Sequence, residues 1–242
     1  MARAACSAVA APPEAARRSI FVLQPLALSL EASGLHIGCT LSAGQFEVHS
    51  GDASAGSLVD ATLHCSGARA RDTYAEWRAA DVLATRACCS PHVASVPTLY
   101  EACCSIGLQY GPDFRTLLQA WGGGGVAASR LRPRSARQGT AVHPADLDGA
   151  LQLSALTSPR GATDGRVLPF AVDEALLGSD VCCGMCATVL QQSSSASLVF
   201  LLDAGGRRSA RLDKFTSRAP RSEASHMVAG NRQWIYRVEW SR

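Results

Sequence analysis

Short segments that are apolar, or that alternate between apolar and polar residues, recur along most of this chain, and Gly, Ser and Asp separate them. Segments of this kind are typical of antiparallel strands. Strands are expected at residues 20–30, 35–42, 45–50 and 58–67, after the glycines of 122–133, and at 167–172, 186–192, 197–204, 210–215 and 233–240. The pattern predicts an α+β fold built on antiparallel sheet, and an arrangement in two similar halves fits it.

Two segments interrupt the strands with helical patterns. Residues 97–108, PTLYEACCSIGL, predict a short helix, and 110–114, YGPDF, predict a turn. In the stretch 143–156, HPADLDGALQLSAL, apolar and small residues recur at helical spacing after Pro144, a residue that suits the first helical position. A helix is therefore predicted over residues 144–156.

Asp148 lies in the middle of this second helix, among apolar and small residues. A carboxylate costs free energy to bury unless it is paired or protonated. Gln152 lies one turn further on, on the same face. Gly149 is costly in a helix by about 1 kcal/mol relative to Ala and is tolerated where a ligand approaches the backbone. Taken alone, the helix fits an exposed carboxylate on an amphipathic helix as well as a functional acid.

Charge and hydropathy exclude some classes of function. The chain has 242 residues and a net charge of +3, and its dense basic cluster, Arg130, Arg132, Arg134 and Arg137, has no aromatic residues between its members. This cluster predicts a solvated loop and no nucleic-acid binding. No apolar run is long enough to cross a bilayer, and residues 1–18 predict a disordered start. A cytoplasmic location is expected, with a plastid location as a weaker alternative because the start has some transit-peptide character.

Two further motifs carry no function of their own. Cys183 and Cys186 form a C-x-x-C, but no second pair lies at zinc-ligand spacing, so the ten cysteines are expected to be free thiols and no metal site is predicted. Gly122, Gly124 and Ala127 fit a loose dinucleotide fingerprint, but no helix pattern follows them. A flexible loop is predicted there.

Five segments occur in an order that resembles the dehydratase domain of polyketide synthases and animal-type fatty acid synthases. They are FEVHS (46–50), TLHCSG (62–67), LYEACCSIGLQYGPDFRTL (99–117), HPADLDGALQ (143–152) and LPF (168–170). The resemblance covers roughly residues 19–220. It implies a double hot-dog fold, in which each half is an antiparallel sheet wrapped around a central helix. It places a partial first half at 19–80, a second half at 81–222 and an exit strand toward a following synthase domain at 223–242.

The resemblance also implies an activity and roles for residues. The reaction removes water from a β-hydroxyacyl thioester carried on the phosphopantetheine arm of an acyl carrier protein, without a further cofactor. Asp148 would be the proton donor and Gln152 would orient it or the substrate hydroxyl, while Tyr110, Gly111 and Pro112 would line the same pocket. The implied partners are the acyl carrier protein and neighbouring synthase domains, and the chain could also form a homodimer.

The family's base, a His in an H-x-x-x-G-x-x-x-x-P motif, has no counterpart in this sequence. His36, His49, His64 and His92 lack the Gly four residues on, and His226 lacks the Pro. We therefore expect the first hot dog to lack its helix and the isolated chain to be inactive. Three explanations of the missing motif are open, in decreasing order of preference. The chain is a fragment of a longer synthase, it is a non-catalytic dehydratase-like scaffold, or a separate polypeptide completes it. A product-template-like cyclisation domain is a further alternative.

Overall fold

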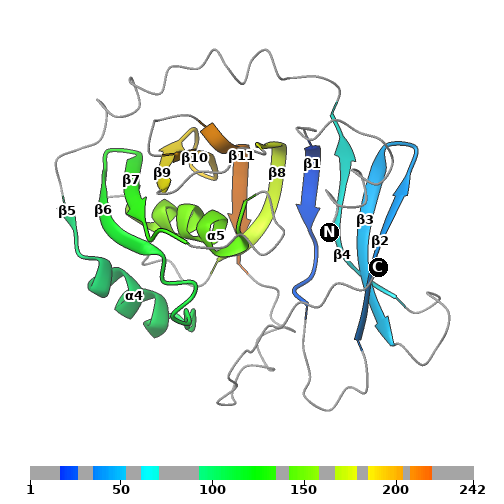
Figure 1. The fold of residues 1–242 in the computed structure, drawn as a ribbon, viewed down its shortest axis with the longest axis horizontal. Coiled ribbons are helices and arrows are strands. Elements are labelled where there is room, and N and C mark those ends of the chain that lie inside the picture. The colour runs from blue at the N-terminus through cyan, green and yellow to red at the C-terminus, as the bar shows by residue number, and fades with distance from the viewer. Residues whose placement is uncertain are drawn as a thin grey trace.

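The computed structural model describes residues 17–26, 35–52, 61–70, 93–134, 142–157, 167–178, 185–203 and 208–219. The strands in these ranges are β1 (Arg17–Val22), β2 (Leu35–Ser42), β3 (Gln45–Asp52), β4 (Thr62–Arg69), β5 (Val93–Ala94), β6 (Leu117–Gly123), β7 (Val126–Leu131), β8 (Leu168–Leu177), β9 (Met185–Gln191), β10 (Ala196–Asp203) and β11 (Arg208–Arg218). The helices are α4 (Val96–Ser105), α5 (Pro144–Gln152) and the 3₁₀ helix η3 (Leu153–Leu156). Antiparallel strands thus dominate, as the sequence predicts (Figure 1).

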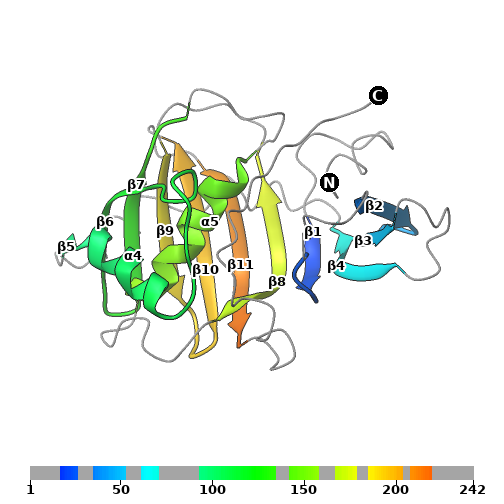
Figure 2. The same ribbon diagram turned by 90° about the horizontal axis from the view of Figure 1, so that it is seen from below.

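All described strands belong to one antiparallel sheet, in the order β2-β3-β4-β1-β8-β11-β10-β9-β7-β6-β5. The strand β1 pairs with β4 on one side and with β8 on the other, so it joins the two halves of the molecule. Figures 1 and 2 show the first half, β1 to β4, beside a second half that curves from β8 to β6. The two halves therefore share a continuous sheet.

The second half wraps around α5, which lies in the hollow of its sheet (Figures 1 and 2). The helix packs on β7, β9 and β10, and η3 continues along β6, β7 and β9. The core contains Ala150 and Leu153 from the helical segment and Val189, Val199 and Leu201 from the strands, none of them more than 1% exposed. The predicted helix at 144–156 is confirmed, with its last turn tightened to 3₁₀ geometry, and the second half has the hot-dog arrangement. In the first half, the described parts of residues 17–70 contain strands and no helix.

The glycine-rich segment after β6 is a tight hairpin turn and not the flexible loop that the sequence predicted. Gly123 pairs with Val126, which leaves Gly124 and Gly125 as a two-residue connection. Their φ values of 63° and 83° are those of a turn that only glycine and a few polar residues adopt easily. The Gly125 backbone N–H also donates to the Thr157 carbonyl at 2.9 Å, which ties the turn to the end of η3.

Several predicted boundaries differ from those observed. Arg17 and Arg18, which the sequence placed in a disordered start, belong to β1, and residues 1–16 lie outside the described residues. The strands β5 and β6 were not predicted from the sequence, and the predicted helix 97–108 begins at Val96 after a Ser95 cap and ends at Ser105. Most of the predicted connector 68–90, the strand at 233–240 and the exit segment 223–242 lie outside the described residues.

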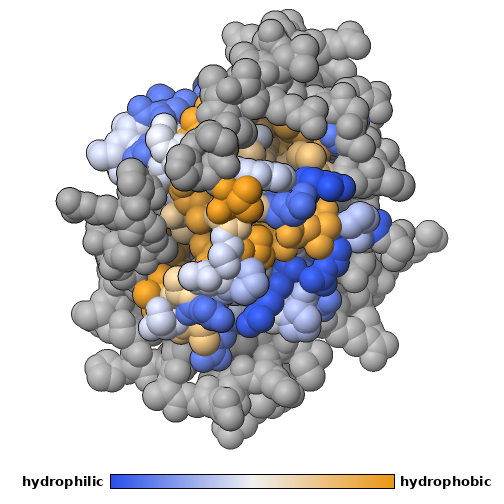
Figure 3. Space-filling model, turned by 90° about the vertical axis from the view of Figure 1, so that its left-hand side faces the viewer, coloured by the Kyte–Doolittle hydropathy of each residue, from blue (hydrophilic) through white to orange (hydrophobic). Residues whose placement is uncertain are grey.

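Figure 3 shows the side of the molecule that carries β5, β6 and α4, where apolar residues gather beside hydrophilic ones. Val93 in β5 and Leu118 in β6 are 75% and 49% exposed. This last described edge of the sheet thus leaves apolar surface that the described residues do not cover. Among the described helices, none has the length and apolar character needed to span a membrane.

Candidate active site

The start of α5 fixes the orientation of the helix in the sheet. The Nδ1 atom of His143 accepts a hydrogen bond from the Ala145 backbone N–H at 3.2 Å, and Pro144 occupies the first helical position, where its missing N–H costs nothing. Ala145 and Ala150 are fully buried against the sheet. Asp148, one turn after Ala145 on the same side of the helix, is half-buried.

Gly149 lets α5 approach the sheet closely. A Cβ added to it would overlap the Thr116 Oγ1 atom and would lie 3.4 Å from the Leu131 Cδ2 atom. The sequence suggested that this glycine makes room for a ligand. In the structure the close neighbours are side chains beside β6 and in β7, so the glycine is required for packing.

The Asp148 carboxyl group has one neutral hydrogen-bond donor. The Gln152 Nε2 atom donates to Oδ2 of Asp148 at 2.8 Å. Burial raises the pKa of Asp148, and the hydrogen bond from Gln152 opposes part of that rise. Among the described residues no Lys or Arg lies within ion-pair distance of this carboxyl group. Asp148 is therefore an acid that holds its proton to a higher pH than an exposed aspartate.

The Gln152 side chain uses both its amide nitrogen and its amide oxygen in hydrogen bonds within the protein. It is 7% exposed, its Nε2 atom also donates to the Phe114 carbonyl at 3.1 Å, and its Oε1 atom accepts a hydrogen bond from the Tyr100 hydroxyl at 3.0 Å. Both amide hydrogens are thus used within the protein. Of the two roles that the resemblance implies for Gln152, this geometry fits the orientation of Asp148.

Tyr100 is a part of this network that sequence reasoning missed. It lies in α4, is 7% exposed, and its hydroxyl accepts a hydrogen bond from the Leu117 backbone N–H at 3.4 Å. Its ring meets that of Tyr110 edge-on, with 6.0 Å between the centroids. The only signal in the sequence was its place in the 99–117 segment, since a tyrosine in an amphipathic helix usually belongs to the core.

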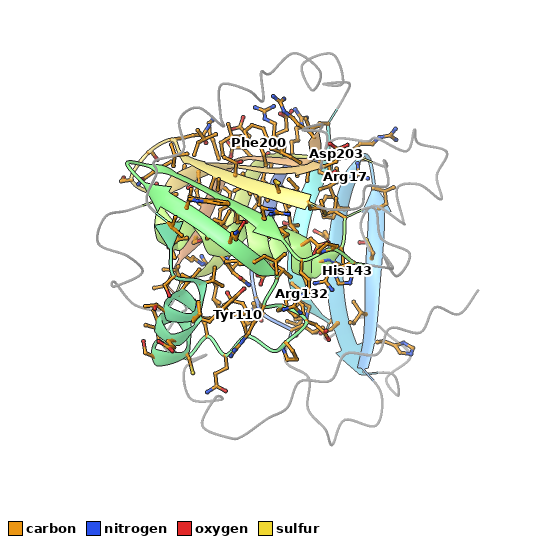
Figure 4. The ribbon with its side chains drawn as sticks, turned by 60° about the vertical axis from the view of Figure 1, so that its left-hand side comes forward. Arg17, Tyr110, Arg132, His143, Phe200 and Asp203 are labelled. Atoms are coloured by element: carbon orange, nitrogen blue, oxygen red, sulfur yellow. The ribbon has the colours of Figure 1, made fainter. Side chains whose placement is uncertain are left out.

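Tyr110 lies close enough to Asp148 for the two groups to affect each other. Burial raises the pKa of the Tyr110 phenol, and the Asp148 charge raises it further. The Cys103 thiol, also buried, has its pKa raised by burial and then by Asp148. In Figure 4, Tyr110 lies beside α4 on the same flank of the molecule as Arg132 and His143. Tyr110, Gln152 and Asp148 are therefore brought together, whereas Gly111 and Pro112 are exposed on the turn that follows.

The basic cluster is only partly the solvated loop that the sequence predicted: Arg132 is exposed outside any strand, whereas Arg130 lies in β7 and Arg134 is half-buried. Arg130 precedes the last residue of β7, Arg132 donates to the Pro112 carbonyl at 3.4 Å, and Arg134 pairs with Asp146 at 2.7 Å. The guanidinium groups of Arg132 and Arg134 contact the turn that follows Tyr110, because β7 runs beside β6 and brings residues 132–134 back to it. Arg137 lies outside the described residues.

No cluster of three or more metal-ligating side chains occurs in the described ranges. Cys186 is a free thiol in β9, and Cys183 lies outside those ranges. His64 hydrogen-bonds Ser50 at 2.6 Å and the Gln24 carbonyl at 3.1 Å, and His49 lies 3.2 Å from Glu47. These two histidines lie in the first half of the sheet. The described site thus contains a half-buried carboxyl group, Asp148, whose hydrogen-bond donor is the neutral Gln152 and whose charge would raise the pKa of both Tyr100 and Tyr110. Such a group is suited to donate a proton to a departing oxygen atom.

Comparisons with known proteins agree with this fold and this segment order. A family model described as the polyketide synthase dehydratase N-terminal domain matches residues 79–226. The spectinabilin polyketide synthase system protein NorB of Streptomyces orinoci is 42% identical over 76 residues, which are 30% of this chain and 4% of that protein. The polyketide synthase GfsE of Streptomyces halstedii is 29% identical over 173 residues, which are 69% of this chain and 4% of that protein. The chain thus spans about 4% of the length of these relatives.

Solved structures show the same fold. The dehydratase domain from the CurF module of the curacin polyketide synthase superposes with a TM-score of 0.71 at 21% identity, covering 89% of this chain and 80% of that one. The dehydratase domain from the CurK module gives a TM-score of 0.70 at 21% identity, covering 92% and 81%. The α+β double hot-dog class expected from the sequence is confirmed.

Proposed function

Because this chain belongs to the polyketide synthase dehydratase family, we propose that it is the part of a dehydratase domain that supplies the catalytic acid. The observation that carries the proposal is the Asp148 carboxyl group, half-buried in the hot-dog helix, with Gln152 as its hydrogen-bond donor. Burial raises the pKa of this carboxyl group, which keeps a transferable proton on it toward neutral pH.

The proposed reaction removes water from a β-hydroxyacyl thioester. A base takes the proton from the α-carbon, the bond between the β-carbon and the hydroxyl oxygen breaks, and the electron pair forms the α,β double bond. Asp148 gives its proton to the departing oxygen, because hydroxide is a poor leaving group. Gln152 holds the Asp148 carboxyl group in one orientation by donating a hydrogen bond to its Oδ2 atom, and Tyr110 lies close to the same group.

The substrate and partners follow from family membership. The proposed substrate is attached to the phosphopantetheine arm of an acyl carrier protein, and neighbouring synthase domains make and consume it. The curated relatives are much longer polyketide synthase proteins, so we expect the chain to work within a larger cytoplasmic polypeptide. A homodimer and a place in fatty acid biosynthesis are further expectations.

We find no counterpart of the family's base in this sequence. No His in the 242 residues fits the H-x-x-x-G-x-x-x-x-P motif. We therefore expect the isolated chain not to dehydrate, since loss of a general base costs roughly 10²–10⁴-fold in rate. The same observation supports the second candidate, a non-catalytic scaffold.

A reconstitution experiment separates these two functions. The isolated chain and a polypeptide in which an H-x-x-x-G-x-x-x-x-P helix precedes it are each incubated with a β-hydroxyacyl carrier protein, and loss of water is followed by mass spectrometry. The proposal requires turnover only in the second case. No turnover in a folded, completed polypeptide would favour the scaffold, and turnover by the isolated chain would reveal a base that we have not identified.

A further inference from the structure

The turn from Tyr110 to Phe114 is held in place mainly by side chains. Two backbone N–H groups, of Phe114 and Arg115, close the turn by donating to the Gly111 carbonyl at 3.0 and 3.1 Å. The remaining carbonyls accept hydrogen bonds from long side chains: Tyr110 from Arg115 Nε at 2.9 Å, Pro112 from Arg132 Nη1 at 3.4 Å, Asp113 from Arg134 Nη2 at 2.7 Å and Phe114 from Gln152 Nε2 at 3.1 Å. Each backbone carbonyl from Tyr110 to Phe114 therefore accepts a hydrogen bond.

Arg134 differs from the other two arginines because it connects the turn to α5. Its Nη2 atom donates to the Asp113 carbonyl at 2.7 Å, and its Nε atom donates to Oδ1 of Asp146, also at 2.7 Å. Asp146 lies in the first turn of α5 and is 5% exposed. A guanidinium group presents its donors in a rigid plane. Arg134 thus ties the Asp113 carbonyl to the first turn of α5, as Gln152 ties the Phe114 carbonyl to the last residue of that helix.

The position of this turn determines where Tyr110 lies. The Tyr110 ring contacts the Tyr100 ring, the Tyr100 hydroxyl donates to Gln152, and Gln152 donates to Asp148. Arg115, the arginine next to the turn, also lies over the Tyr100 ring, 5.4 Å from its centroid. A movement of the turn away from α5 would therefore separate Tyr110 from this chain of contacts.

We propose that Arg134 is a positioning residue, which acts through Asp146 and the Asp113 carbonyl to hold Tyr110 beside the Asp148 carboxyl group. The proposal rests on the proposed function of Asp148. Arg134 has no direct part in the chemistry, because Asp146 and Asp148 are two residues apart and point in different directions from the helix. Its effect passes through the turn.

Stability alone is a weak reason for such a pair. The Arg134 and Asp146 side chains are 21% and 7% exposed, and removal of these charges from water offsets much of their attraction. Pairs of this kind are better suited to selecting one geometry than to adding stability. The geometry selected here is that of the Tyr110 turn.

The test uses the chain itself, with tyrosine labelled at the ring carbon that carries the hydroxyl, and Tyr110→Phe to assign its signal. The variants are Arg134→Gln, Arg134→Lys, Asp146→Asn and the double variant Arg134→Gln/Asp146→Asn. Arg134→Lys keeps the charge beside Asp146 but cannot make both contacts, so it covers the case in which Arg134→Gln fails to fold. Arg132→Gln is the matched control, since it removes an arginine that donates to the same turn without an ion pair.

Burial raises the pKa of Tyr110, so release of the turn should lower that pKa and remove the proximity signal between the rings of Tyr100 and Tyr110. We expect both changes in Arg134→Gln and in Arg134→Lys, and neither in Arg132→Gln. The double variant has no unpaired buried carboxylate, so it should regain thermal stability while Tyr110 stays released. In a turnover-competent synthase, Arg134→Lys should lower kcat on the order of 10-fold or more with little change in KM, because misplacement affects the chemical step.

The proposal is overturned if the proximity signal between the rings of Tyr100 and Tyr110 persists in the folded Arg134→Lys and double variants, or if kcat is unchanged in Arg134→Lys. The proposed function fails separately, by turnover in an Asp148→Asn synthase. In that case the proximity signal between the rings of Tyr100 and Tyr110 still decides whether Arg134 holds the turn, because that readout needs no catalysis.

Discussion

Asp148 illustrates how burial sets the chemistry of a single residue. Its neighbours in the described structure are neutral, so desolvation is the largest influence on its pKa and raises it. The protonated form therefore stabilises the folded state below the ordinary pKa of aspartate, and this contribution is lost as the pH rises through the folded-state pKa.

The variant Asp148→Asn should reveal how much stability the buried Asp148 carboxylate costs the wild type at neutral pH. Asparagine has the same shape and does not titrate, so we expect the free energy of unfolding of the variant to exceed that of the wild type at neutral pH. This gain should shrink as the pH falls from the raised folded-state pKa of Asp148 toward the ordinary pKa of aspartate, and stay constant below it. Urea denaturation across the pH range measures the difference. Glu101→Gln, on the exposed side of α4, is the control for loss of one carboxylate. A difference that is independent of pH would contradict the buried-acid account.

Gln152 should affect both the free energy of unfolding and the pKa of Asp148. Gln152→Leu leaves the Tyr100 hydroxyl and the Phe114 carbonyl without their partner, and an unsatisfied buried polar group costs about 1–3 kcal/mol. It also removes the hydrogen bond that opposes the rise in the pKa of Asp148, so that pKa should increase further. Denaturant unfolding and NMR titration of the Asp148 carboxyl carbon measure the two effects. Gln119→Leu, at an exposed position of β6, should change neither.

At the scale of the element, α5 depends on a close approach to the strands. Gly149→Ala improves helix propensity by about 1 kcal/mol, but its Cβ overlaps the Thr116 Oγ1 atom. Overpacking of a core costs about 1–3 kcal/mol, so we expect a net loss of stability. Removal of that atom by Thr116→Ala should recover part of the loss in the double variant. A Gly149→Ala protein more stable than the wild type would show that the helix can move away from the sheet.

The sequence predicted elements whose signals are local and missed those that depend on distant partners. The helix at 144–156 and the strand at 35–42 were clear because spacing and turn residues specify them. The strand β6 was missed because its glycines, Gly122 and Gly123, read as loop. In the structure Gly122 is required because its missing Cβ makes room for Leu156. The pairing of Arg134 with Asp146 could not be predicted, since it requires the registry of β6 with β7.

The same distinction applies to the candidate site. The sequence placed Asp148 and Gln152 on one helical face and, through the family resemblance, Tyr110 beside them. It gave no role to Tyr100, whose hydroxyl reaches Gln152 only after α4 packs on β6. The roles of the site residues in catalysis stay predictions.

At the scale of the whole molecule, β1 makes the two halves one sheet. It pairs with β4 and β8, so a change in either half is transmitted through a strand that both share. Phe21 of β1 and Phe170 of β8 contact each other across this junction, with 6.3 Å between ring centroids, and the Arg218 guanidinium lies 3.9 Å from the centroid of the Phe170 ring. We expect Phe170→Ala to destabilise the domain by about 3 kcal/mol or less, since the site is only half-buried. Thermal unfolding of the variant should show a single transition at a lower temperature than in the wild type. Separate transitions for the two halves would contradict a shared sheet.

The measurement that tests the account most directly is dehydration by a synthase polypeptide that contains this chain together with the helix bearing the base. The wild type and Asp148→Asn are compared on the same β-hydroxyacyl carrier protein, with loss of water followed by mass spectrometry and the fold checked by circular dichroism. The account predicts a folded variant in which turnover falls by at least 10²-fold, because asparagine has no proton to transfer. A folded Asp148→Asn enzyme that dehydrates at the wild-type rate would show that the acid lies elsewhere.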